Sequence, residues 1–340
     1  MAFYFVLAIG FLVSGIVKAF YEVWLRPQLI RRMMSRQGVH GPPYNLLHGN
    51  NREVSRMKEL AAGQPINNLS HDLLPKVLPH VAKWTAAYGK DYLSWLGMEA
   101  QLVVANPAQV KELLDNKDRV FFKLPPESFI KKVLGGGLVA SEGDKWAKMR
   151  KIANHAFHGK SLKGMVQDMV DSTHMMLERW KDHQGKEIEV FEEFKELTSE
   201  VISRTAFGSS YMEGRTIFDM LTRLAMLAAK NALTTRIPGI RKILRTPDQE
   251  EADRLELALR SAILQIIEKR ESYFRTGELD GYGNDFLGLL IKALHDQDDQ
   301  NRITVDDLID ECKTRKQEGR CLMWLGIKIQ MQTAFQGLRR

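Results

Sequence analysis

The sequence predicts a mainly α-helical protein with a small β-sheet, an α+β fold class. Apolar residues recur at helical spacing in three long segments, residues 161–183, 191–207 and 253–274. Two short runs rich in aromatic and β-branched residues, 91–97 and 101–105, flank a turn and predict a pair of strands. The small β element therefore precedes most of the helices.

The amino terminus, residues 2–25, is predicted to be a membrane anchor. Residues 2–17 contain no charge, Lys18 can extend its ammonium toward the interface, and Trp24 suits that interface. A helix that continues to Leu25 is long enough for a hydrocarbon core of about 30 Å. Basic residues follow the apolar run and none precedes it, so the positive-inside rule places the body of the protein in the cytosol.

A cleaved signal peptide is the alternative interpretation of this segment. It requires a basic start and a small-residue cleavage site; the basic start is missing and no good cleavage site follows. Residues 26–48 are basic and contain the Gly41-Pro42-Pro43 run, which stiffens the chain. We interpret 26–48 as a hinge between the anchor and the body.

The body reads as a series of helices around the strand pair. A helix over 73–88 is predicted to break at Pro79, and Asn106-Pro107 is a helix start with an Asn cap. Residues 117–141 are predicted to be irregular. Further helices are expected over residues 161–183, 191–207, 216–231, 253–274 and 285–295.

The net charge of +7 is concentrated at the end of the chain. Residues 315–340 contain six basic residues against one glutamate, a net +5, so the other 314 residues carry only +2. A nucleic-acid partner is not expected, because it requires basic residues across a folded face with aromatic platforms. The two cysteines, Cys312 and Cys321, form neither a disulfide framework nor a zinc pattern. This low cysteine content fits a protein in a reducing compartment.

Trp146 and Arg150 are the candidate cofactor-binding residues. They follow a glycine triplet and a Ser-Glu-Gly-Asp turn, and their spacing of four residues places them on one helical face. An indole donor beside a fixed cation suits an acidic ligand group against an apolar wall. The alternative is a tryptophan in the core with its arginine at the surface.

The chain around this pair resembles the plant-type, membrane-bound cytochrome P450 family of haem-thiolate monooxygenases. The stretch 194–214, FKELTSEVISRTAFGSSYMEG, carries more of the resemblance than the W-x-x-x-R pattern, because so many neighbouring positions agree. The resemblance covers residues 1–313. It rests on WAKMRKIANHAFH, the 194–214 stretch, IPGIRKI and ITVDDLIDECK.

The resemblance implies the N-terminal portion of the P450 fold, incomplete, with a partial catalytic domain over 49–313. It implies a haem whose propionate Trp146 and Arg150 hold, electrons from an NADPH-dependent reductase, and a small lipophilic substrate. It also implies a single-pass protein of the endoplasmic reticulum membrane with its body facing the cytosol.

The sequence departs from the family pattern after Lys313. The oxygen-activating segment of the long central helix does not follow. Neither cysteine lies in an F-x-x-G-x-R-x-C-x-G pattern. Before Cys321, Gly319 and Gln317 stand where arginine and glycine belong, and Cys312 lies inside the entry to the central helix. We therefore expect no axial thiolate and assign no catalytic or metal-ligating residue. Residues 314–340 are interpreted as an aberrant basic tail, from a frameshift, a retained intron or a misjoined exon.

Three functions remain open from the sequence. The first is a monooxygenase of this family, and the second is a non-catalytic, membrane-anchored remnant from a truncated or misassembled gene product. The third is a helical scaffold without oxygen chemistry, which the extent of the resemblance disfavours. The substrate loops do not identify the substrate.

Overall fold

The structure confirms a mainly helical fold with one two-stranded sheet. The computed structural model describes residues 2–65, 71–115, 120–123, 126, 128–234, 245–278 and 280–314. The chain divides into two compact units. Unit 1 comprises Met1–Phe121 and Lys230–Arg245, and unit 2 comprises Phe122–Ala229 and Thr246–Arg340. The basic tail beyond Thr314, with Cys321, lies outside the described residues.

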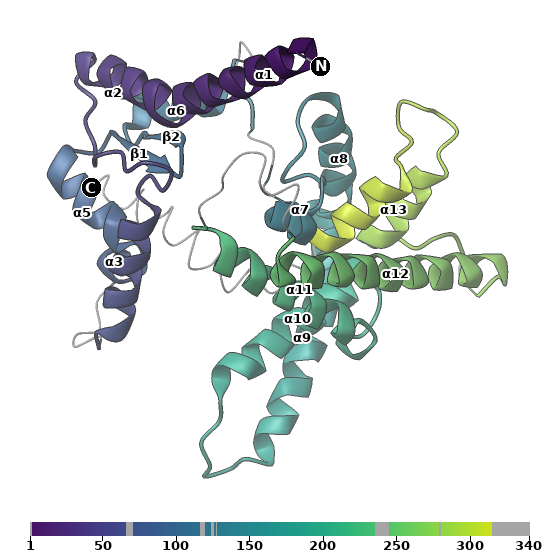
Figure 1. Cartoon of the computed structure of the whole chain (residues 1–340). Helices are drawn as coiled ribbons and strands as arrows, with labels where there is room; N and C mark the ends of the chain where they lie inside the picture. Colours follow the sequence, from purple (N-terminus) through teal and green to yellow (C-terminus); the bar gives the residue numbers. More distant parts are fainter. Residues whose placement is uncertain are drawn as a thin grey trace. The chain divides into compact units, whose positions relative to one another are not determined.

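Unit 1 begins with a nearly continuous helix (Figure 1), made of α1 (Ala2–Phe20), a π-helical turn η1 (Tyr21–Leu25) and α2 (Arg26–Arg36). By length and composition, its residues 3–36 could cross a membrane. The helix extends into the range expected to be hinge. Pro27 cannot donate a hydrogen bond to the Val23 carbonyl, as an α-helix would require, and the Tyr44 hydroxyl donates to that oxygen instead at 2.8 Å.

The sheet pairs β1 (Tyr92–Leu96) with β2 (Glu99–Val103) in antiparallel register, with Leu96 opposite Glu99. The second strand starts two residues before the predicted position, because the connection is a two-residue turn in which Gly97 adopts a positive φ of 60°. β1 is mostly buried and β2 is mostly exposed.

Three helices of unit 1 precede the sheet and pack on one another: α3 (Asn51–Gly63), α4 (Leu74–Val77) and α5 (Pro79–Tyr88), of which α5 contacts β1. The helix predicted over 73–88 does break before Pro79. Side chains at the start of α3 hold the β-hairpin, since Asn50 accepts a hydrogen bond from the Trp95 amide at 2.9 Å and Asn51 from the Gly97 amide at 3.1 Å. The small core contains Val54, Trp84 and Tyr92, and α6 (Pro107–Asp115) follows the sheet.

His80 on α5 makes this unit sensitive to pH. Burial, with a smaller contribution from the positive charge of Lys58, lowers the pKa of His80 from 6.5 to about 4. Between these values the unfolded chain binds a proton that the folded chain excludes, so stability is lost as the pH falls from 6.5 toward 4. We expect the urea midpoint of the wild type to fall between pH 7 and pH 5 more than that of His80→Leu. Equal falls in both proteins would contradict this assignment.

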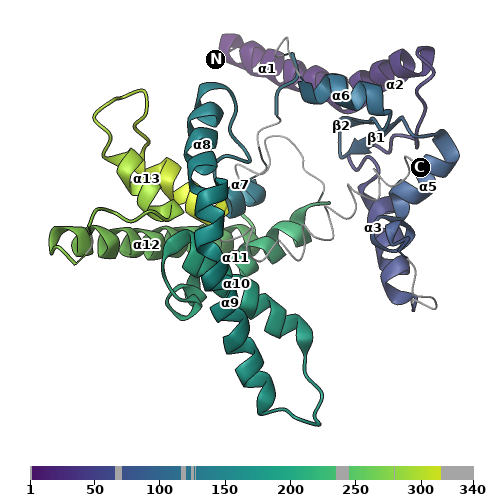
Figure 2. The ribbon, with the colours of Figure 1, turned by 180° about the vertical axis from the view of Figure 1, so that it is seen from behind.

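The described part of unit 2 consists of helices joined by loops. α9 and α10 form a hairpin whose turn points away from α12 in both views (Figures 1 and 2), while α13 packs on α8, α10 and α12. A further helical stretch covers residues 305–314. The named helices are α7 (Ser128–Leu134), α8 (Gly143–Ala156), α9 (Gly159–Lys181), α10 (Val190–Phe207), α11 (Tyr211–Asn231), α12 (Pro247–Arg275) and α13 (Phe286–Leu294).

Two sequence predictions in this unit are corrected. Residues 117–141 are not irregular throughout, because α7 forms within them and buries Phe129 and Val133. α12 starts at Pro247 rather than at residue 253. The reason is a complete capping box, in which Thr246 and Gln249 exchange side-chain and backbone hydrogen bonds, with proline at the first helical position.

α10 buries a different face from the one its apolar spacing indicates. Phe194 remains 41% exposed, whereas Ser199, Glu200 and Ser203 are buried. The Ser199 hydroxyl donates to the Lys195 carbonyl at 2.7 Å, one turn earlier, so this small residue is buried without an unpaired hydroxyl. The apolar spacing along α10 therefore coincides with its buried face only in the last turn, where Thr205, Ala206 and Phe207 are buried.

The core of unit 2 joins helices that are distant in the sequence. On α12, Leu259, Ile263 and Ile267 are buried, as the amphipathic pattern predicts. They belong to one cluster with residues of α8, α10, α11 and α13 and with helix 305–314. This cluster fixes the position of α8, which carries the candidate site.

Candidate functional site

Trp146 and Arg150 lie one turn apart on the exposed side of α8. The opposite side of the helix buries Met149, Ala153 and Ala156. Trp146 is 42% exposed and lies outside the core formed by the described residues. Because α8 buries Met149, Ala153 and Ala156 on one face, its other face is exposed and carries the hydrogen-bond donors of Trp146 and Arg150.

The pair has the chemistry of an acid-binding site. Within the described part of the chain, neither the Trp146 indole nor the Arg150 guanidinium forms a hydrogen bond or an ion pair with another residue. An arginine keeps its charge and offers several donors in a fixed plane, while the indole offers one donor and an apolar face. A carboxylate attached to a flat apolar molecule satisfies both.

The start of helix 305–314 holds α8 in place. The Lys145 ammonium on α8 forms an ion pair with Asp307 at 2.5 Å, and Lys148 donates to the Arg302 carbonyl at 3.0 Å. Asp307 also caps its own helix through Thr304. Burial by itself would raise the pKa of Asp307, but the hydrogen bonds from Lys145 and Thr304 hold it below its usual value.

Acidic side chains of helix 305–314 accept hydrogen bonds from the glycine loop, residues 135–138, which precedes α8. The Gly136 amide donates to Asp310 Oδ2 at 2.7 Å, and the Leu138 amide donates to Glu311 Oε1. Gly135 has a positive φ of 67°, and a Cβ there would overlap the Asp310 side chain. Glycine is therefore required for this close approach.

Half-buried Lys132 and buried Lys313 balance carboxylates of α12 and of helix 305–314. Lys132 on α7 contacts Asp253 at 2.6 Å and Glu256 at 2.5 Å, and the buried Lys313 lies 3.7 Å from Glu256 and 3.4 Å from Asp310. Burial tends to lower the pKa of Lys132, but the two carboxylates outweigh it and raise that pKa. The site region is thus tied to α7, α12 and helix 305–314.

This network was not predicted from the sequence. Most of its partners lie far apart in the chain, 174 residues for Gly136 and Asp310 and 121 for Lys132 and Asp253, and no local spacing connects them. The available signal was chemical, namely a glycine triplet in one segment and adjacent acids in ITVDDLIDECK. Cys312, in the same helix, is buried.

Comparison with known proteins decides the family. The family model for cytochrome P450 matches residues 73–315. The chain belongs to the cytochrome P450 family. It is 47% identical over 305 residues to cytochrome P450 CYP749A22 of Panax ginseng, with 89% of this chain covered. It is 33% identical over 342 residues to cytochrome P450 734A1 of Arabidopsis thaliana, with 96% covered, and 35% identical over 292 residues to cytokinin hydroxylase of the same plant, with 86% covered.

The chain spans 58%, 63% and 56% of the lengths of these three P450 relatives. Solved structures show the same fold at low sequence identity. The haem domain of cytochrome P450DA matches with a TM-score of 0.55 at 20% identity, over 74% of this chain and 55% of that one. The retinoic acid-bound cyanobacterial CYP120A1 matches with a TM-score of 0.53 at 18% identity, over 70% of this chain and 51% of that one. The fold is therefore part of a P450 haem domain.

Proposed function

We propose that this chain forms the N-terminal part of a haem-dependent P450 monooxygenase in which Trp146 and Arg150 hold a haem propionate. The observation that carries the proposal is their exposed, unpartnered arrangement on one face of α8. Such a pair fits the acidic edge of a flat apolar cofactor. When bound, the haem would supply the oxygen-activating chemistry.

The residues of this chain have defined tasks in that function. The Arg150 guanidinium would neutralise the propionate, and Trp146 would donate a hydrogen bond to it and cover the edge of the ring. The ion pair between Lys145 and Asp307, at 2.5 Å, would keep both side chains at a fixed position relative to helix 305–314. Positioning of the cofactor edge is thus the part of the reaction that this chain performs.

The substrate, the redox partner and the location are part of the same proposal. A small lipophilic substrate, O₂ and an NADPH-dependent reductase follow from the family, and the hydroxylase among the relatives supports oxygen insertion. The apolar helix supports an anchor over 2–25, before a hinge over 26–48 and a partial catalytic domain over 49–313. The basic residues after it favour the endoplasmic reticulum membrane with the body in the cytosol.

A non-catalytic, membrane-anchored remnant is the second candidate. The observation behind it is that neither Cys312 nor Cys321 lies in an F-x-x-G-x-R-x-C-x-G pattern. Without a thiolate on the iron, O–O cleavage is not favoured. In this second candidate the α8 pair is inherited, but no oxygen is activated.

Haem titration of the full 340-residue chain in lipid nanodiscs tests the α8 pair. We expect saturable quenching of tryptophan fluorescence, and about 10-fold weaker binding for Arg150→Met because a charge-assisted hydrogen bond is lost. Arg215→Met, which changes an exposed arginine on α11, should leave the affinity unchanged. Haem dimethyl ester, which lacks the charged propionates, should bind wild type and Arg150→Met equally.

The outcomes separate the two candidates. No saturable haem binding by the wild type would refute the propionate site and favour the remnant. A carbon monoxide difference spectrum of the reduced complex then tests the iron ligand. We expect no band at the position typical of thiolate-ligated P450 haem, and its appearance would show that a cysteine of this chain binds the iron.

A further inference from the structure

Unit 1 contains a small pocket where α2 ends and the proline-rich segment contacts β1. It has a volume of about 50 Å³. A cavity of about 10–15 Å³ already holds one water, and sites for whole small ligands measure about 300 Å³ or more. Its wall includes Arg31 and Ser35 of α2, His40 and Pro42 of the following segment, and Trp95 of β1. The pocket is therefore sized for one compact polar group.

Backbone hydrogen bonds hold the walls of this pocket together. Gly38 turns the chain after α2 with a φ of 79°, and its amide donates to the Ser35 carbonyl at 3.1 Å. The chain then returns to the sheet, where the Leu93 amide donates to the His40 carbonyl at 3.0 Å. The Ser35 hydroxyl and His40 Nδ1 lie 3.5 Å apart. The turn thus brings His40 back to Ser35, so that α2 and the proline-rich segment form one wall.

Two donors of the pocket have no partner among the described residues. Trp95 is only 2% exposed, and its indole nitrogen is buried without a hydrogen-bond partner. The exposed Arg31 forms neither a hydrogen bond nor an ion pair there, whereas its neighbour Arg26 is paired with Glu22 at 2.8 Å. The described residues that line the pocket include no acid. A buried donor that lacks an acceptor is costly, and beside a free arginine it favours an anionic group.

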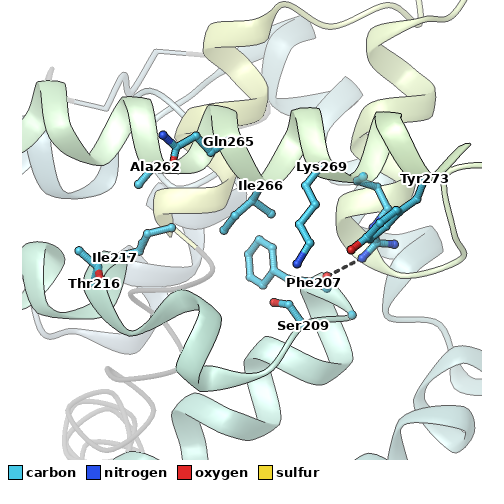
Figure 3. A pocket seen from close by; sticks show the side chains of 11 residues that line it. Phe207, Ser209, Thr216, Ile217, Ala262, Gln265, Ile266, Lys269 and Tyr273 are labelled. Carbon is cyan, nitrogen blue, oxygen red and sulfur yellow. Dashed lines mark hydrogen bonds between the residues drawn. The ribbon is translucent and has the colours of Figure 1, made fainter. Parts of the chain in front are cut away.

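A larger cavity, in unit 2, differs in this respect. It has a volume of about 430 Å³ and lies between the α10–α11 connection and α12 (Figure 3). Its arginine is engaged by the protein, because Arg270 donates to the Phe207 carbonyl at 2.6 Å and to Asp285 at 2.8 Å. Of these two spaces, the pocket of unit 1 is therefore the one whose arginine is available to a ligand.

The pocket lies close to the level of the lipid headgroups if residues 2–25 span the membrane. Arg31 is six residues beyond Leu25 on the same nearly continuous helix, about 9 Å along its axis. The headgroup layer on each side of a bilayer is about 5–8 Å thick, and an arginine side chain extends its charge toward it. Arg32 and Arg36, exposed on the same helix, attract an anionic membrane surface. A lipid phosphate can therefore reach the pocket.

We propose that this pocket binds the headgroup of phosphatidate, an anionic phospholipid that ends in a bare phosphate. The inference rests on the proposed anchor over 2–25. The guanidinium of Arg31 pairs with two phosphate oxygens, and the Ser35 hydroxyl and the Trp95 indole donate hydrogen bonds to the phosphate as well. Headgroups that carry glycerol or inositol on the phosphate are too large for a space of about 50 Å³. The pocket thus selects this lipid by size as well as by charge.

Native mass spectrometry of the full 340-residue chain in detergent micelles tests the proposal by counting bound lipids. Phosphatidate is titrated against phosphatidylglycerol with the same acyl chains, which is anionic but carries glycerol on its phosphate. We expect one saturable phosphatidate site, with an affinity at least about 10-fold higher than that for phosphatidylglycerol. Arg31→Gln should abolish this preference, and Trp95→Phe should lower it about 5-fold because one donor is lost. Arg32→Gln, a matched loss of charge outside the pocket, should leave it unchanged.

Equal affinity for the two lipids would overturn the proposal, because charge alone would then account for binding. An equal loss of the preference in Arg31→Gln and Arg32→Gln would do the same. If circular dichroism shows that Trp95→Phe does not fold, Ser35→Ala takes its place, and an unchanged preference in both Ser35→Ala and Arg31→Gln counts against the pocket. Displacement of phosphatidate by about 1 mM inorganic phosphate would assign the pocket to free phosphate and overturn the lipid proposal.

Co-flotation of the chain with lipid vesicles tests the anchor separately. A chain that does not float, but prefers phosphatidate in micelles, would refute the anchor and support the pocket. A chain that floats without this preference would refute the pocket and leave the anchor in place. The two failures are therefore distinguishable.

Discussion

Replacement of Asp285 by alanine is expected to destabilise unit 2 by about 3–5 kcal/mol, the usual cost of removing one partner of a buried ion pair. The side chains of Arg270 and Asp285 are only 12% and 18% exposed. Without the carboxylate, the guanidinium stays charged beside the Phe207 and Tyr282 carbonyls, which only partly compensate it. Urea unfolding of the full chain, followed by far-ultraviolet circular dichroism, measures the loss.

Two further variants separate the causes of this loss. Asp285 Oδ1 also caps α13 by accepting from the Gly288 amide at 2.8 Å, and a helix cap contributes about 1 kcal/mol. Asp285→Asn keeps an acceptor for the cap but removes the charge, so it should lose most of the stability that alanine loses. Arg270→Met combined with Asp285→Ala should be more stable than Asp285→Ala. If asparagine restores wild-type stability, the ion pair is not the main contribution.

The second large effect is expected at Gly41, in the proline-rich segment after α2. The Leu93 amide on β1 donates to the His40 carbonyl at 3.0 Å, and a Cβ on Gly41 would overlap the Leu93 carbonyl oxygen. The obstacle is backbone, so a change of side-chain rotamer cannot relieve it. We expect Gly41→Ala to cost about 3 kcal/mol, at the upper end for overpacking, and to release this segment from β1.

Hydrogen exchange of the Leu93 amide, measured by mass spectrometry, reports this release directly. Gly63→Ala is a matched control, because Gly63 ends α3 with no atom near its Cβ position and should show wild-type exchange at β1. Unchanged protection of Leu93 in Gly41→Ala would show that the segment does not depend on the close approach. A release would show that the segment proposed as a hinge docks on β1 through this close approach.

Local patterns allowed much of the fold to be predicted. The helix break before Pro79 follows from proline geometry, and the buried stripe Leu259, Ile263 and Ile267 follows from helical spacing. The patterns failed where the local signal was incomplete. α7 is too short for a clear period, and α10 buries Ser199, Glu200 and Ser203 beside its apolar Ala206 and Phe207, so its own apolar residues do not define the whole buried face.

The candidate site, too, was predicted from the sequence only in part. The spacing of Trp146 and Arg150 placed both on one face of a helix, but only packing of Met149 and Ala153 into the core decided that this face is exposed. The contacts that hold α8, from Lys145 to Asp307 and from the glycine loop to Asp310, join residues far apart in the chain. No period or motif within one segment encodes such pairs.

The sequence by itself determined the family and the order of the helices, because both are written in short-range motifs and periodicity. The tertiary structure decided which faces are buried, why Gly135 and Gly41 cannot carry a side chain, and where Arg270 closes the wall of a cavity. The physical reason is that burial, close backbone approach and charge pairing depend on residues that are distant in the sequence and meet only in the folded chain. Among these contacts, the close approach of the Gly135 loop to Asp310 lies beside α8, which carries the proposed haem edge.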